Sequence, residues 1–165
     1  MRYKISYYPK AGIAILAGLL ISVSVFGQVN FSGTWSLNES KSKISEGGFR
    51  MVPHRIIIAQ SGNTFTLDRF SGRDGRKITE IFTLDGKESR NNIFNTEKNS
   101  IATWSVDKKV LTISSNLIID MNGQKNEIKT IEIYSLSDGN DLLTIDSRSS
   151  SPMGERRNIL VFDRK

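Results

Sequence analysis

The sequence predicts an all-β domain, folded as an antiparallel up-and-down β-barrel of eight to ten strands. Short runs rich in Ile, Val, Thr, Phe and Tyr recur along the chain, as is typical of strands. Downstream of Gln28, no stretch keeps apolar residues at helical spacing over three turns. The runs are joined by short turns, whereas parallel neighbours need crossovers of roughly a dozen residues or more. The sheet is therefore expected to be antiparallel.

Five strands are predicted in the first part of the domain, at 34–38, 50–60, 64–70, 76–84 and 89–95. Each carries β-branched or aromatic residues, and the last has the weakest β signal. Turn sequences separate several of them, namely Ser61-Gly62-Asn63, Asp74-Gly75 and Asp85-Gly86. Gly, Asn and Asp tolerate the positive φ angles that tight hairpins require. In 76–84, Ile78 and Phe82 alternate with Thr79 and Thr83, which predicts one apolar face and one wet face.

Five more strands are predicted at 101–106, 110–119, 126–136, 142–147 and 157–163. Their connections are Asp107-Lys108-Lys109, Asn122-Gly123 and Asp138-Gly139-Asn140. In the last strand, Leu160, Phe162 and Arg164 share one face. The serine-rich segment 147–152 is interpreted as a bulged or flexible stretch near the barrel mouth.

The connection lengths favour a barrel over a sandwich. Without helices to cover a sheet, the strands must close on themselves or stack as two sheets. An up-and-down barrel needs only hairpins, whereas a Greek-key sandwich needs at least one long connection. The only longer loop is 39–49, directly after the first strand. The barrel is therefore the preferred architecture.

Residues 1–27 have the layout of a signal peptide. Arg2, Lys4 and Lys10 give a positive start without acids, an apolar stretch follows, and small residues precede the predicted cleavage before Gln28. The apolar stretch 11–27 is shorter than the roughly 20 residues that a membrane span needs, although an uncleaved anchor is the alternative. This predicts a single exported domain at 28–165, periplasmic or extracellular, with no membrane span after cleavage.

Composition excludes several kinds of site. The chain has no Cys, so it has no disulfide and no thiolate-bound zinc, and a single His54 excludes metal sites with two imidazoles. We therefore expect no metal and no cofactor. The formal charge of +6 falls to +3 once the leader is removed, which is ordinary for solubility and argues against a nucleic-acid partner.

Few residues suggest catalysis. His54 has no local nucleophile to activate, so it is interpreted as a solvated rim residue. Most acidic residues fall at turns, where Asp bonds its own backbone, and no catalytic residue is assigned. An anion patch at one hairpin end is conceivable, but a solvated rim explains the same charges; the residues concerned are Arg69, Arg73, Arg76, Lys77 and Arg90.

The segment Phe31-Ser32-Gly33-Thr34-Trp35-Ser36-Leu37 carries a Gly-x-Trp at the head of the first strand. It resembles the opening of lipocalins and fatty-acid-binding proteins, the calycin barrels. With the turn at 84–88 and the ending 134–165, the chain is similar to small secreted bacterial lipocalin-like proteins. The resemblance implies that Gly33, Trp35 and Arg164 close one end of the barrel, with Arg164 packed across the Trp35 ring.

The chain also departs from these families. The loop 39–49 is too short for the helical lid of fatty-acid-binding proteins, and no helix follows the last strand, unlike in typical lipocalins. A barrel of eight strands can be packed or can hold one small ligand. The strand residues that are candidates to line such a cavity are Phe65, Leu67, Ile81, Trp104, Tyr134 and Phe162.

The preferred functional hypothesis is a non-enzymatic exported barrel that binds or carries a small hydrophobic ligand. The alternative is a protein-interaction or inhibitor module of the cell envelope that works through its outer face or a rim. Either hypothesis is compatible with the sequence, because the same apolar residues can fill a barrel or line its cavity.

Overall fold

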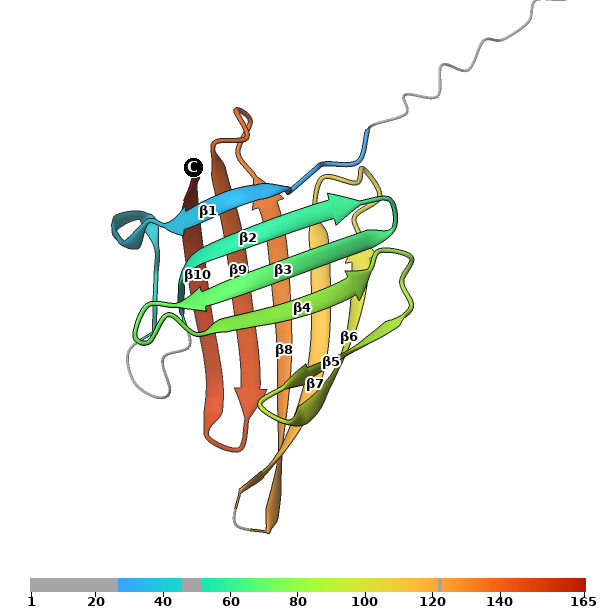
Figure 1. Cartoon of the computed structure of the whole chain (residues 1–165), viewed down its shortest axis with the longest axis vertical. Helices are drawn as coiled ribbons and strands as arrows, with labels where there is room; N and C mark the ends of the chain where they lie inside the picture. The colour runs from blue at the N-terminus through green and yellow to red at the C-terminus, as the bar shows by residue number, and fades with distance from the viewer. Residues whose placement is uncertain (1–26, 46–51, 122) are drawn as a thin grey trace, which may run out of the picture.

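The computed structural model describes residues 27–45, 52–121 and 123–165. Ten antiparallel strands form one sheet, which confirms the predicted all-β fold (Figure 1). They are β1 (Gly33–Leu37), β2 (Pro53–Ser61), β3 (Thr64–Ser71), β4 (Lys77–Thr83), β5 (Glu88–Ile93), β6 (Thr96–Trp104), β7 (Leu111–Met121), β8 (Gln124–Leu136), β9 (Leu142–Ser151) and β10 (Gly154–Arg164). The predicted signal peptide lies outside the described residues, apart from Gly27.

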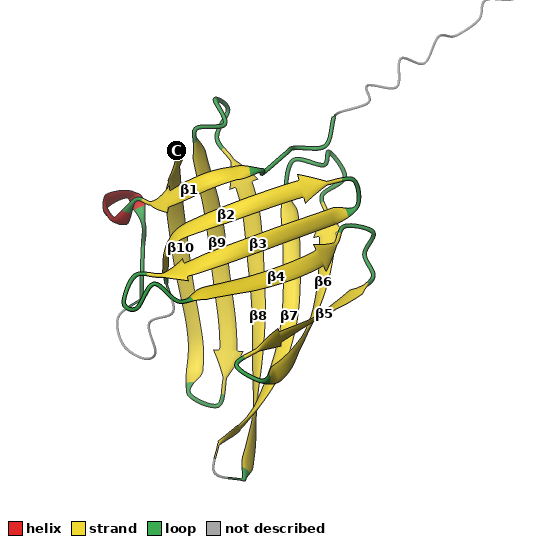
Figure 2. Cartoon of the chain, viewed as in Figure 1, coloured by secondary structure: helices red, strands yellow, loops and turns green. Residues whose placement is uncertain are grey.

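The sheet is a meander in which β1 pairs with both β2 and β10, so that the first and last strands are neighbours. In Figure 1, β1 to β4 cross in front of β8 to β10 as two layers of one nearly closed barrel. The described chain includes one short 3₁₀ helix, Glu39–Lys41, after β1 (Figure 2). No helix of the described part is long and apolar enough to cross a membrane.

Side chains bridge the place where the barrel does not close by strand pairing. Strands β4 and β5 share no ladder in the described chain. The Asn91 side chain accepts from the Ile81 amide at 2.8 Å and donates to the Ile81 carbonyl at 3.0 Å. The Ser89 hydroxyl accepts from the Thr83 amide at 2.9 Å. These bonds satisfy part of an edge that would otherwise expose unpaired backbone groups.

The structure corrects two strand boundaries. β6 begins at Thr96 rather than at 101, because Phe94 and Asn95 form a tight turn with φ angles of 53° and 60°. The β propensity of Phe94 hid this turn from the sequence analysis. The serine-rich segment is regular strand, since β9 continues to Ser151 and pairs with β10 along its length.

The hydrophobic core occupies the barrel end nearest the start of β1. An aromatic cluster lies at its centre, with Phe31 in contact with Phe65, Trp104 and Tyr134. The aliphatic side chains around it come from β2, β3, β7, β9 and β10. We call this region the closed half. The other half of the barrel contains the end of β3 and the start of β4, together with the loop after β1.

Candidate functional site

The closed half ends at the pair Trp35 and Arg164, which are direct neighbours in the β1–β10 ladder. The Arg164 guanidinium lies 4.2 Å from the centroid of the Trp35 ring, as the resemblance implies. Trp35 is fully buried, and its indole nitrogen donates to the Phe31 carbonyl at 3.0 Å. Arg164 donates to the carbonyls of Ser32 and Asn140 at 3.0 and 2.9 Å. The guanidinium thus joins three segments over the ring.

Gly33 makes room for this arrangement. Its φ of 152° lies in a region that L side chains rarely adopt. A Cβ at this position would lie 2.8 Å from Nη1 of Arg164. Any larger residue at this position would therefore displace the guanidinium from Trp35.

The predicted cavity residues lie mainly in the packed core. Phe65, Leu67, Tyr134 and Phe162 are fully buried there, and Trp104 packs against them partly buried. Each faces inward, as the strand alternation indicated. They occupy the closed half, whereas the open pocket described below is lined by other residues.

Ile81 is a correction to the predicted set. It is 52% exposed, because its neighbours Glu80 and Phe82 are the residues of β4 that face inward. Successive side chains of a strand point to opposite faces, so Ile81 must point outward. The sequence analysis selected Ile81 because it is apolar and did not take account of its place in the alternation.

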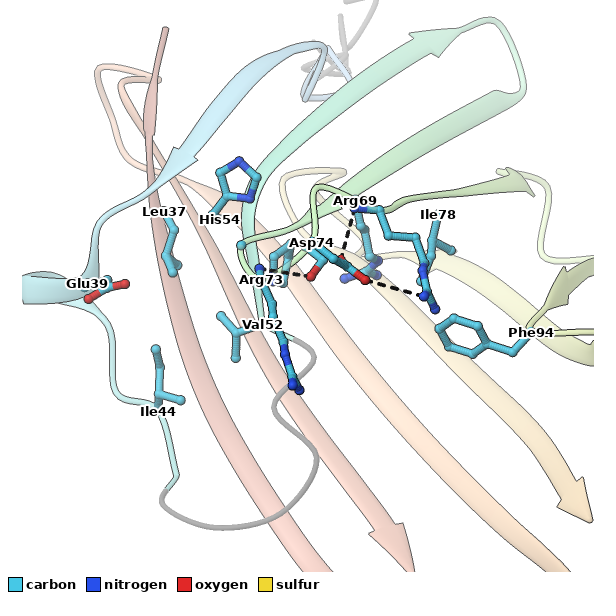
Figure 3. A pocket seen from close by; sticks show the side chains of 14 residues that line it. Leu37, Glu39, Ile44, Val52, His54, Arg69, Arg73, Asp74, Ile78 and Phe94 are labelled. Carbon is cyan, nitrogen blue, oxygen red and sulfur yellow. Dashed lines mark hydrogen bonds and ion pairs between the residues drawn. The ribbon is translucent and has the colours of Figure 1, made fainter. Parts of the chain in front are cut away.

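An open pocket of about 980 Å³ lies in the half of the barrel away from Trp35 (Figure 3). Leu37, Ile44 and Val52 lie on one side of it, and Ile78 and Phe94 on the other. Among the residues that the structure describes, the lining is Leu37, Glu39, Ile44, Val52, Pro53, His54, Arg69, Ser71, Gly72, Arg73, Asp74, Arg76, Ile78 and Phe94. The described lining is mixed, with seven polar or charged residues beside the apolar ones, and small-molecule sites combine apolar surface with polar groups that fix orientation.

The β3–β4 turn shapes the mouth of this pocket. The Asp74 carboxylate accepts from the Arg76 amide at 3.1 Å and pairs with the Arg76 guanidinium at 3.4 Å. The same guanidinium lies 5.9 Å from the centroid of the Phe94 ring. The backbone amide bond and the Arg76 charge hold the pKa of Asp74 below its usual value. Asp74 therefore stays ionised and keeps the turn folded.

A network of ionised side chains lies behind the pocket wall. Arg69, which lines the pocket, donates to Glu80 at 3.2 Å and to Glu132 at 2.6 Å. Lys98 donates to the other oxygen of Glu80 at 2.6 Å. Tyr134 donates to Glu132 at 2.9 Å and accepts from Arg69 at 3.1 Å. We call these five residues the inner charge network.

Two members of the network, Glu132 and Tyr134, have shifted pKa values. Burial by itself raises the pKa of Glu132, but the charges of Arg69 and Lys98 and the hydrogen bonds from Arg69 and Tyr134 outweigh it, so the pKa lies below its usual value. Burial raises the pKa of Tyr134 well above its usual value, so its hydroxyl remains a donor. The salt bridges of the network pair two basic side chains, Arg69 and Lys98, with two carboxylates, Glu80 and Glu132.

Sequence reasoning found only part of this site. It grouped Arg69, Arg73 and Arg76, which do line one pocket, but it treated all of them as rim residues. Arg69 is instead an inward residue whose side chain is 15% exposed. Glu80 and Glu132 were missed, although Glu80 lies between the inward Ile78 and Phe82 of β4 and Glu132 occupies the inward position before Tyr134 in β8. A charge at a core position of an alternating strand is the signal that could have found them.

His54 is exposed at the pocket rim, as expected for a solvated histidine. Within the described ranges, no group of three or more His, Asp or Glu residues is placed to hold a metal ion. Glu80 and Glu132 are both engaged by cations at 3.2 Å or less.

Comparison with known proteins supports the fold. No protein-family model and no curated protein matches the sequence. A zebrafish ileal bile acid-binding protein, solved with cholic acid, superposes with a TM-score of 0.55 and 16% identity, over 82% of this chain and 98% of its own. A secretory abundant heat soluble protein from Ramazzottius varieornatus gives 0.55 and 11%, over 85% and 98%. The chain therefore has a calycin-type β-barrel fold.

Proposed function

We propose that this protein binds and carries a small hydrophobic molecule in the open pocket, without catalysing a reaction on it. The observation that carries the proposal is the pocket itself, whose volume of about 980 Å³ is at the upper end of the range for small-molecule sites. The similar structures include a protein described as binding bile acid, which supports a binding role for this fold.

The lining suits an amphipathic ligand. Five apolar side chains, namely Leu37, Ile44, Val52, Ile78 and Phe94, provide surface against which a hydrophobic body can pack. Burying an apolar ligand there gains about 25 cal/mol per Å² of surface removed from water. The polar groups at the mouth and at Arg69 give such a ligand an orientation.

The proposal includes export. The positive, acid-free start of the chain and the apolar stretch before Gln28 are typical of a secretory signal, so the working protein is the domain 28–165 in the periplasm or outside the cell. Mass-spectrometric sequencing of the mature protein tests this. A start near Gln28 supports export, and Met1 on membrane-embedded protein contradicts it.

A neutral environment-sensitive dye, Nile red, tests binding. The purified folded protein should bind it in a 1:1 ratio, and the binding should be lost on unfolding. Ile78→Trp places a large side chain in the pocket and should weaken dye binding about tenfold or more. The matched control is Ile81→Trp, the same substitution on the outward face of the same strand.

Ile81→Trp should leave dye binding unchanged, because Ile81 is exposed on the outer face. Equal effects of both variants, or dye bound only by partly unfolded protein, would contradict the carrier role. The protein-interaction role at the outer face would then be the better account.

A further inference from the structure

The inner charge network indicates which class of ligand the pocket takes. This inference rests on the proposed function. We propose that the pocket binds an uncharged amphipathic molecule, such as a long-chain alcohol, amide or ester, and discriminates against carboxylates and other anions.

The charged groups beside the pocket wall balance one another. Arg69 is the least exposed of the described Arg residues that line the pocket, and its side chain is 15% exposed. Two carboxylates already neutralise it together with Lys98, at 2.6 to 3.2 Å. The four charges sum to zero, so the network has no net positive charge to offer an anion.

A ligand carboxylate would need a position beside Arg69, where the protein already has carboxylates of its own. The Glu132 carboxylate accepts from both Arg69 and Tyr134, so the protein supplies its own anion between these two donors. A second carboxylate beside Arg69 would lie near Glu80 and Glu132, and like charges at low dielectric repel strongly. It would also lose its hydration without gaining an uncompensated cation.

Arg69 can still donate a hydrogen bond to an uncharged oxygen. Its recorded bonds to Glu80, Glu132 and Tyr134 use Nε and Nη2. A guanidinium has five N–H donors, so a hydroxyl or carbonyl oxygen that enters the pocket can accept from it. Such a group brings no charge into the network. An uncharged polar head therefore has a donor to bond, and an anion has no counter-charge.

The mouth does not reverse this preference. Among the described residues, the charged side chains that line it are Arg73 and Arg76, with Asp74 and Glu39. Two cations therefore face two anions, and the pair Asp74 and Arg76 is in contact at 3.4 Å. These residues are exposed, so solvent and salt screen them. The balance at the mouth adds no net attraction for an anion.

The test compares two ligands of the same chain length, dodecan-1-ol and dodecanoic acid, as competitors of Nile red at pH 7.5. The acid is ionised at this pH. The alcohol should displace the dye with an affinity on the order of tenfold higher or more. Equal or tighter binding of the acid would overturn the inference and leave the carrier role standing. Absence of dye binding as well would overturn both.

Glu132→Gln tests the cause. It removes one negative charge beside Arg69, so the affinity for dodecanoate should rise relative to that for dodecanol. Glu127→Gln is the matched control, because Glu127 lies on the outer face of the same strand, exposed and paired with Lys129 at 3.3 Å. An unchanged ratio in folded Glu132→Gln would overturn the role of this carboxylate. The wild-type comparison decides the ligand class even if that variant does not fold.

Discussion

The two halves of the barrel share strands but differ in the side chains that these strands direct inward. In β9, Leu143 and Ile145 are buried in the closed half, and serines occupy the inward positions that follow. In β7, Leu111 and Ile113 precede Ser115, whose hydroxyl bonds Ser100 at 2.9 Å. The inward face of β9 thus changes from large apolar to small polar residues, whereas in β7 Ser115 is followed by the half-buried Leu117 and Ile119.

The closed half is solid because large apolar side chains fill it, whereas the other half of the barrel contains the pocket. Large apolar side chains interdigitate to the density of an organic crystal and leave few voids. The closed half therefore supplies most of the packing that stabilises the fold.

The largest expected effect is the loss of the aromatic that ends the closed half. Trp35→Ala should lower the free energy of unfolding by about 3 to 5 kcal/mol, because it empties a fully buried site beneath Arg164. Chemical denaturation measures this loss. A loss below about 1 kcal/mol would show that the two halves do not differ in their contribution to stability.

Adding volume should separate the halves more directly. Leu67→Trp overpacks the closed half and should cost about 1 to 3 kcal/mol, since Leu67 is fully buried. Ile78→Trp adds volume in the pocket and should cost less than the Leu67 change. Thermal unfolding of the two variants gives the comparison. Similar losses in both would indicate that the open half is as tightly packed as the closed half.

A smaller effect is expected at Arg164. Arg164→Ala removes the guanidinium from the Trp35 ring and should cost about 0.5 to 2 kcal/mol. The double variant with Trp35→Ala should lose less than the two single losses together, because the residues share a contact. Strict additivity in denaturant unfolding would show that the ring contact contributes nothing.

The smallest effect is expected on the outer surface, at Asp146. Hydrogen bonds from Arg157, at 2.8 and 2.9 Å, and from Arg148 hold the pKa of Asp146 below its usual value. A lowered folded-state pKa contributes stability above the unfolded pKa, and this is lost as the pH falls through the folded value. Asp146→Asn should therefore cost little at pH 7, less in high salt, and nothing in strong acid. A loss that persists in acid would point to a packing role instead.

Much of the fold was predictable because its signals are local. Gly, Asn and Asp mark the hairpin turns, and apolar alternation marks the inward residues of each strand. The turn at Phe94 escaped because a β-forming residue occupies a positive-φ position. Ile81 was misplaced because apolarity outweighed its position between Glu80 and Phe82.

The site was less predictable because its parts meet only across the barrel. Arg69 and Glu132 are 63 residues apart in the chain, and their contact depends on the register of every intervening ladder and on closure between β4 and β5. No local pattern encodes such a distance.

By itself, the sequence determined most of the strands, the hairpin turns other than the one at Phe94, and the meander order, because each depends on neighbours in the chain. Only the tertiary structure decided that β1 and β10 meet at Trp35 and Arg164, that four charges neutralise one another behind the pocket wall, and that the space lies at the end opposite Trp35. The physical reason is that side-chain volume and charge act through space, and barrel closure sets which strands share that space.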